Sequence, residues 1–176
     1  MEHRLLLDDL NRTIDFWATH LEQYSFTQLS AKPSRESWSL GQVYMHLIEN
    51  AYYYFEQIKT CVSTNANADK EASSVAKKML LANEFPDELI EGPPENADTP
   101  QPLNKEQLVQ HIKKIKDEII HIDKLISSSR YKGKTKHPGL YYFSAAEWLQ
   151  FTDMHFRHHL RQKSRLDDFL KANNIH

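Results

Sequence analysis

Four stretches of the chain repeat hydrophobic residues at alternating intervals of three and four positions, as an amphipathic helix requires. They cover residues 2–24, 39–61, 104–126 and 148–170. Polar and charged residues fill the positions between, so each stretch has one face to bury. No stretch shows a convincing strand pattern, and no internal repeat is present. The pattern therefore predicts an all-α fold, a four-helix bundle with one long connection between the second and third helices.

Three of these helices are expected to begin at capping boxes, in which two side chains satisfy the first backbone amides. The predicted pairs are Ser39 with Gln42, Asn104 with Gln107, and Ser144 with Glu147. Residues 26–37 are predicted to be a connection, because a Lys-Pro-Ser turn signal stands at residues 32–34. Residues 130–143, which contain a His-Pro-Gly sequence, are predicted to be a loop.

The connection between the second and third helices is the irregular part of the chain. Residues 71–82 are predicted to form a short helix with Val75, Met79 and Leu80 directed inward. The segment 84–103 is rich in proline, which excludes regular structure there. A connection of this length is commonly a lid or wall over a site, or a crossover. A passive surface loop is an equal alternative.

Composition restricts the class of protein and its surroundings. A chain of 176 residues fits a single domain, residues 1–176, with a real core. A formal net charge of -2 argues against nucleic acid and anionic membranes as partners. No apolar run approaches the ~20 residues that span a bilayer. The single Cys61 excludes an internal disulfide, and no secretory signal is recognisable, so we expect the cytoplasm.

The inner face of the last helix carries two histidines where a bundle normally places Leu or Ile. This face consists of Trp148, Thr152, His155, His159, Gln162, Leu166 and Phe169. A buried imidazole needs a hydrogen-bond partner or a metal ion, because desolvation without one is costly. His155 and His159 are one helical turn apart, and His46 lies on the apolar face of the second helix. Facing helices of a bundle can bring such side chains together.

Spacing alone leaves two interpretations of these three histidines equally open. Three imidazoles would hold Zn²⁺ and leave its fourth position for water, and nickel or iron(II) would also accept them. A bound water could then attack an electrophile, or a substrate thiol could take that position as thiolate. Alternatively, each histidine is a core residue satisfied by a neighbouring Tyr, Asn or carbonyl group. Phe156 stands where the HExxH motif requires its glutamate, so that motif does not apply.

Other polar residues near the histidines are assigned supporting roles. Asn50 follows His46 by one turn and is a pocket candidate. Gln162 faces inward and is predicted to hydrogen-bond a metal-binding imidazole. His158 is expected at the surface or on the rim of the site, and Asp153 is expected to form a solvated pair on the outer face. No general base or nucleophile has a local signature, so no catalytic residue is assigned.

Two stretches of the sequence resemble the DinB-like superfamily, which includes metal-dependent hydrolases of the YfiT type. Residues 38–49, WSLGQVYMHLIE, have the form W-S followed by H-L. Residues 137–162, HPGLYYFSAAEWLQFTDMHFRHHLRQ, contain H-P, W-L-x-F and H-x-x-x-H. The resemblance implies a four-helix bundle with a divalent metal held by His46, His155 and His159. The superfamily also includes bacterial thiol S-transferases, which bind a low-molecular-weight thiol at the metal, and members without known activity.

These observations lead to three functional hypotheses. The first is a metal-dependent hydrolase or thiol S-transferase that acts on a small molecule, with zinc or nickel as the preferred ion and iron as a further candidate. The second is a non-catalytic, metal- or ligand-binding stress-response bundle, which the missing general base favours. The third is a structural bundle with three satisfied core histidines. The aromatic residues at 52–55 allow a homodimer interface or line the pocket.

Overall fold

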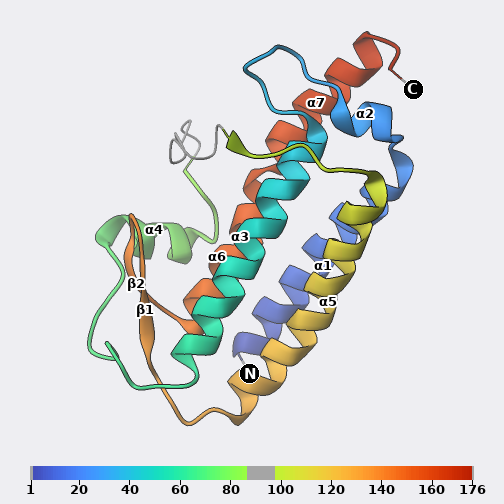
Figure 1. Cartoon of the computed structure of the whole chain (residues 1–176). Helices are drawn as coiled ribbons and strands as arrows, with labels where there is room; N and C mark the ends of the chain where they lie inside the picture. Colours follow the sequence, from blue (N-terminus) through green and yellow to red (C-terminus); the bar gives the residue numbers. More distant parts are fainter. Residues whose placement is uncertain (1, 87–97, 176) are drawn as a thin grey trace.

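The computed structural model describes residues 2–86 and 98–175 and is dominated by long helices (Figure 1). Its main rods are α1 (Glu2–Gln23), α3 (Leu40–Cys61), α5 (Lys105–Ser128) and the pair α6 (Ala145–His158) and α7 (Leu160–Ala172). Helix α3 packs against α5 and α6, and α1 packs against the same two helices. The predicted all-α bundle is therefore confirmed, with α1 diagonal to α3 and α5 diagonal to α6.

The direction of the helices explains why the connection after α3 is long. The colours of Figure 1 show α1 rising, α3 and α5 descending, and α6 with α7 rising again. Two neighbouring parallel helices cannot be joined by a tight turn, so the chain must return from the end of α3 to the start of α5. The connection between α3 and α5 is thus a crossover. A crossover was one of the interpretations that the sequence allowed for it. Residues 87–97 of the proline-rich segment 84–103 lie outside the described residues.

The crossover carries the short helix α4 (Ser74–Ala82), which packs against α6. Met79 is buried and Leu80 is partly buried, as predicted. The prediction was wrong for Val75, whose exposed fraction is 57%. The helix begins two to three residues later than expected, because the Ser73 side chain caps it by accepting from the amide of Ala76. The buried face of α4 consists of Ala76 and Met79, and Val75 lies beside this face.

Two predicted irregular segments contain regular structure. Within 130–143, strands β1 (Lys134–His137) and β2 (Tyr141–Ser144) form an antiparallel hairpin. Each strand has four residues, too few for an alternating pattern to stand out in the sequence. Within 26–37, Phe26–Ser30 forms the short helix α2, which opens with a capping box between Ser25 and Gln28.

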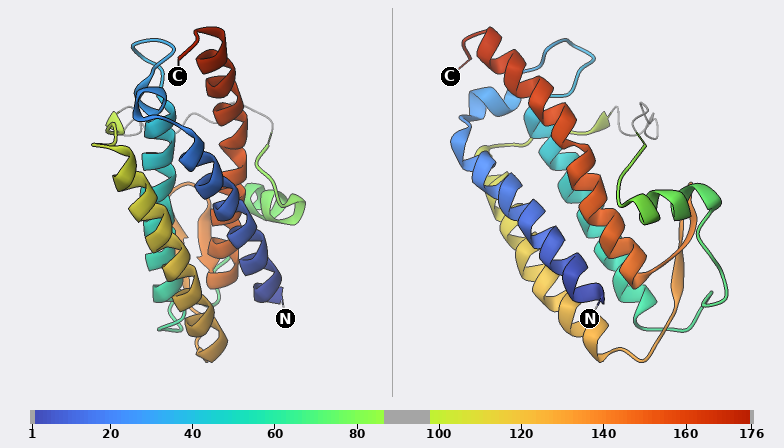
Figure 2. Two further views of the ribbon diagram at one scale, coloured as in Figure 1. Left: turned by 90° about the vertical axis from the view of Figure 1, so that its right-hand side faces the viewer. Right: turned by 180° about the vertical axis from the view of Figure 1, so that it is seen from behind.

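The last rod is interrupted at His159, where a single continuous helix over 148–170 was predicted. His159 has φ −72° and ψ −8°, so the peptide after it is turned away from ideal helical geometry. The amide of Lys163 still donates to the His159 carbonyl. The right view of Figure 2 shows that α6 and α7 therefore follow one another along nearly the same line. The predicted inner face is largely kept across the junction, with Trp148, Thr152, His155 and Leu166 buried.

The capping predictions were confirmed at two of three helix starts. Ser39 with Gln42 and Ser144 with Glu147 form reciprocal boxes at α3 and α6. Asn104 caps α5 by accepting from the Gln107 amide, but the Gln107 side chain accepts from the Leu103 amide and not from that of Asn104. None of the described helices is sufficiently long and apolar to cross a membrane.

Asp153 was predicted to form a solvated pair on the outer face of the last helix. The pair forms, with Arg157, but the Asp153 side chain is buried. Its exposed fraction is 3%. It accepts from Thr13 Oγ1 of α1 at 2.6 Å and from Arg157 Nε at 2.8 Å. The reason is that α6 packs against both α1 and α3, so two of its faces are covered and the side opposite the histidines is not free.

Candidate metal centre

The three histidines singled out in the sequence converge in the structure. His46 comes from α3, His155 from α6, and His159 from the junction of α6 and α7. The Nε2 atom of His155 lies 3.2 Å from Nε2 of His46 and 3.2 Å from Nε2 of His159. All three ligand nitrogens lie within 4.8 Å of one another. Adjacent packing of α3 and α6 produces this convergence, since each helix turns its histidine face toward the other.

The outer nitrogens of two rings have partners that determine where the proton lies. Gln162 Oε1 lies 2.8 Å from His159 Nδ1, and because an amide oxygen only accepts, Nδ1 of His159 donates. Tyr54 donates its hydroxyl to Asn50 Oδ1 at 3.2 Å and lies 3.4 Å from His155 Nδ1. Its oxygen is therefore the acceptor for His155. Both rings then direct an unprotonated Nε2 toward the centre.

His46 is held by Asn50, one helical turn further along α3. Asn50 Nδ2 donates to the His46 carbonyl at 2.8 Å and lies 3.2 Å from His46 Nδ1. In this arrangement His46 carries its proton on Nε2 and can donate it to His155. Coordination through Nε2 would need that proton on Nδ1 instead. Asn50 and Gln162, both predicted as supporting residues, are thus in contact with rings of the centre.

Burial keeps the three imidazoles neutral at pH 7. Desolvation, with a smaller contribution from His159, lowers the pKa of His46 to about 3. Desolvation lowers the pKa of His159 to about 4, although its hydrogen bond to Gln162 acts in the opposite direction. The pKa of His155 lies well below its ordinary value, chiefly through burial and then through the other two histidines. Neutral rings are the form that binds metal ions.

The geometry and the type of donor atom fit a divalent transition metal. His155 Nε2 has one lone pair, so hydrogen bonding accounts for at most one of its two short contacts. The contact with His159 then sets two lone pairs against each other, which a cation between them would relieve. Zinc–nitrogen bonds of about 2.0–2.1 Å in a tetrahedron place the nitrogens about 3.3 Å apart, close to the observed 3.2 Å. A set of three imidazoles suits Zn, Ni or Fe better than Mg or Ca.

Aromatic side chains surround the centre and limit its contact with water. The ring of Phe151 stacks on His155 at 6.4 Å, and Trp38 lies 4.9 Å from the ring of His46. Phe85, from the start of the proline-rich segment, lies 6.2 Å from His155 and 4.9 Å from His158. The described beginning of that segment is therefore a wall of the site. His158 is half-buried on the rim, under Phe85.

Sequence reasoning did not assign these aromatic residues to the site. Trp38 belonged to the quoted W-S motif and Tyr54 to the aromatic run at 52–55, so both carried a signal. Tyr54 contacts His155, whereas Tyr53 of the same run is exposed. Phe85 carried no signal, because it stands alone in an irregular segment and is brought to His155 only by the path of the crossover.

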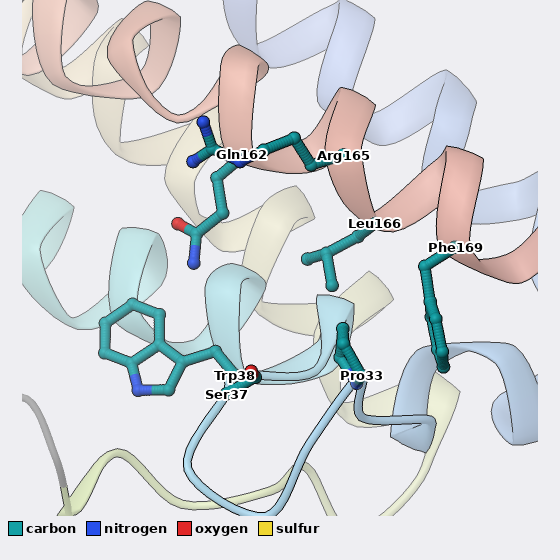
Figure 3. A pocket seen from close by; sticks show the side chains of 7 residues that line it. All are labelled: Pro33, Ser37, Trp38, Gln162, Arg165, Leu166 and Phe169. Carbon is teal, nitrogen blue, oxygen red and sulfur yellow. The ribbon is translucent and has the colours of Figure 1, made fainter.

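A groove of about 380 Å³ lies between the start of α3 and α7, and Figure 3 shows the side chains that line it. Its lining residues are Pro33, Ser37, Trp38, Gln162, Arg165, Leu166 and Phe169. Two of these residues also contact the centre. Trp38 packs on His46, and Gln162 hydrogen-bonds to His159. His159 is also less buried than the other two histidines. The groove is therefore next to the centre, separated from the histidines by the side chains of Trp38 and Gln162.

Carboxylates take no part in the contacts of the centre. Within the described ranges, no Asp or Glu side chain hydrogen-bonds or ion-pairs with His46, His155 or His159. The nearest polar groups are the amides of Asn50 and Gln162 and the hydroxyl of Tyr54. The arrangement can thus bind a cation and fix its ligands, but it supplies no carboxylate as a general base.

Comparison with known proteins gives one family. The sequence model of the DinB superfamily matches residues 9–162, which run from α1 into the first turn of α7 and include all three histidines. No curated protein matches the chain. No solved structure matches it.

Proposed function

The chain belongs to the DinB superfamily, and we propose that its function depends on a divalent metal ion bound by His46, His155 and His159. The protein acts on a small molecule at this centre, as a thiol S-transferase or a metal-dependent hydrolase. Zinc and nickel are the preferred ions, with iron(II) as a further candidate. The geometry of the three histidines and the family both fit a metal-binding protein. The reaction catalysed at the metal is our proposal.

One observation carries the proposal. The Nε2 atoms of three neutral rings point at a common position, while the Nδ1 atoms of His155 and His159 face Tyr54 and Gln162. Core histidines that merely fill space would need a donor opposite each Nε2 lone pair. Only His46 carries a proton on Nε2, so the lone pair of His155 or that of His159 has no donor opposite it. A bound cation would satisfy both of these lone pairs, and that of His46 as well once its proton moves to Nδ1.

The protein's own residues contribute orientation and exclusion of water. Gln162 and Tyr54 accept the Nδ1 protons and thereby fix two rings with their Nε2 lone pairs inward. Phe151, Phe85 and Trp38 keep the surroundings apolar, which strengthens electrostatic interactions at the centre. When bound, a divalent metal would act as a Lewis acid and lower the pKa of a thiol or water in the open position.

The missing carboxylate favours thiol transfer over hydrolysis. Attack by water is usually assisted by a positioned general base, and no Asp or Glu of the described residues contacts the centre. A thiol has an ordinary pKa of about 8.5, so it loses its proton near neutrality with little help. The sulfur would form a bond to an electrophilic carbon of the second substrate, the leaving group would depart with the bonding electrons, and the thiol proton would pass to solvent.

The lack of a carboxylate at the centre also favours a second function, that of a non-catalytic bundle that binds metal or ligand in a stress response. A measurement of turnover distinguishes the enzyme from the non-catalytic bundle. Metal-loaded protein should be screened with low-molecular-weight thiols paired with electrophiles, and with ester and amide substrates. We expect thiol conjugation that is lost on chelation and in His159→Ala. Turnover that survives complete removal of metal would contradict the proposal. No turnover with retained metal binding would favour the non-catalytic bundle.

A further inference from the structure

The groove beside the centre presents hydrogen-bond donors without matching acceptors. Arg165 lines it, and no carboxylate among its lining residues opposes that charge. In the described part of the chain, Arg165 has no ion-pair partner, whereas Arg157 pairs with Asp153 and Arg12 with Asp9. Its positive charge is therefore available to a ligand in the groove.

Gln162 supplies a second donor. Its Oε1 atom is occupied by His159 Nδ1, but its Nε2 group has no partner among the described residues. Figure 3 shows the Gln162 amide nitrogen directed to the side of Trp38, and the Arg165 side chain running along α7 toward Gln162. An acceptor that reaches the groove would meet both groups close to the centre.

Apolar surface completes the lining. The indole of Trp38 forms one wall, and Leu166, Phe169 and Pro33 form the opposite end of the groove (Figure 3). A volume of about 380 Å³ is at the lower end of the range for small-molecule sites. The surface thus suits a short carbon skeleton that carries one anionic group.

From this geometry we infer that the substrate at the metal centre is a small organic carboxylate, whose carboxylate group is bound by Arg165 and Gln162. A guanidinium and one amide match the planar, two-oxygen shape of a carboxylate. A phosphate would call for more donors than the groove contains. The inference rests on the proposed function, because it assigns the chemistry of the substrate at that same site.

The test uses two thiols of equal chain length, the anionic 3-mercaptopropionate and the neutral 3-mercaptopropan-1-ol. Each is titrated into the cobalt(II)-loaded protein, and the thiolate-to-cobalt absorption band gives its Kd. The variants are Arg165→Gln, Arg165→Lys and Arg4→Gln. Arg4 lies exposed near the start of α1, at the opposite end of the molecule, so its variant changes net charge equally without touching the groove.

We expect wild-type protein to bind the acid at least about threefold tighter than the alcohol, the scale of a partly solvated ion pair. Arg165→Gln should abolish that preference, Arg165→Lys should retain part of it, and Arg4→Gln should leave it intact. A preference that is missing in wild type, or that survives in Arg165→Gln, overturns the inference while the metal centre stands. If cobalt is not taken up, or neither thiol reaches it, the proposed function fails and this inference fails with it.

Discussion

Each histidine of the centre depends on a neighbouring residue that fixes its ring. Gln162 accepts from His159, and Tyr54 accepts from His155. Asn50 contacts both His46 and Tyr54, so a single amide links two of the rings. Groups of this kind orient metal ligands, and replacing one of them typically lowers metal affinity by roughly ten- to a hundredfold.

Replacing Gln162 should weaken the centre without removing it. Gln162→Leu leaves His159 Nδ1 without its acceptor, so the ring loses its fixed orientation. We expect metal affinity to fall by roughly ten- to a hundredfold, with one metal ion still bound at saturation, as measured by competition with a chromogenic chelator. Gln162→Glu keeps an acceptor and should bind at least as tightly as wild type. Equal affinity in the leucine and glutamate variants would show that the hydrogen bond is immaterial.

Asp153 is a buried carboxylate whose removal should lower the stability of the protein. Asp153→Ala removes the acceptor of both Thr13 and Arg157 in a buried position. We expect the free energy of unfolding in urea to fall by about 1–3 kcal/mol. Asp9→Ala, which breaks an exposed pair with Arg12, should change it by less than about 0.5 kcal/mol. Similar losses in the two variants would indicate that burial of Asp153 contributes nothing.

Among the structural elements, α6 matters most because it presents His155 and ends beside His159. It is fixed at its start by a capping box and by the hairpin β1–β2, which places the buried Phe143 against Trp148. Further along α6, Gln150 and Arg157 donate to Asn83 at the C-terminus of α4. This anchors the segment that carries Phe85 over His155.

The contribution of the α6 capping box to stability can be measured separately. Ser144→Ala removes the acceptor for the Glu147 amide and the donor to the Glu147 carboxylate. The free energy of unfolding should fall by about 1 kcal/mol. Ser164→Ala, at an exposed position inside α7, serves as the control and should leave the free energy of unfolding unchanged or slightly higher, because alanine has the higher helix propensity. An equal response of the two variants in urea unfolding would contradict the assigned cap.

Long elements were predictable from the sequence and short ones were not. The stripes of α1, α3 and α5 extend over several turns, so periodicity identified them almost to the residue. The strands of the hairpin are too short for such a signal, although the helix α2 did carry an unnoticed capping box at Ser25. The interruption at His159 does not shift the inner face, so the spacing of inward-facing residues in the sequence gave no sign of it.

The composition of the site was partly predictable for a similar reason. Residues on the long helices, including His46, His155, His159, Asn50 and Gln162, were found from their positions on inward faces. Phe85 and the burial of Asp153 depend on which elements pack together, and the sequence of one helix does not contain that information.

At the scale of the whole molecule, a polar centre in the bundle makes stability depend on pH. In the metal-free fold the pKa of His46 is about 3 and that of His159 about 4, whereas an unfolded histidine titrates near its ordinary value of 6.5. Between these values the unfolded chain binds more protons than the folded one. Acidification through that window therefore stabilises the unfolded state.

Metal-free protein should consequently lose stability between pH 7 and pH 5, by several kcal/mol in total, since each pKa unit corresponds to about 1.4 kcal/mol. Urea unfolding at both pH values measures the loss. His155→Gln removes one of the buried titrating rings and should show a smaller pH dependence than wild type. His121→Gln, at an exposed position on α5, should behave as wild type. A flat pH response in the wild-type protein would contradict the burial of neutral imidazoles.

The central claim is that imidazoles from α3 and from the α6–α7 rod bind one cation. Its most direct measurement is the metal content of protein purified without a histidine tag, determined by elemental analysis alongside circular dichroism. We predict one divalent transition-metal ion per chain in the wild type and in His121→Ala, and none in His159→Ala despite unchanged helical content. Stoichiometric metal in His159→Ala, or no metal uptake by the wild type when it is supplied, would contradict the account.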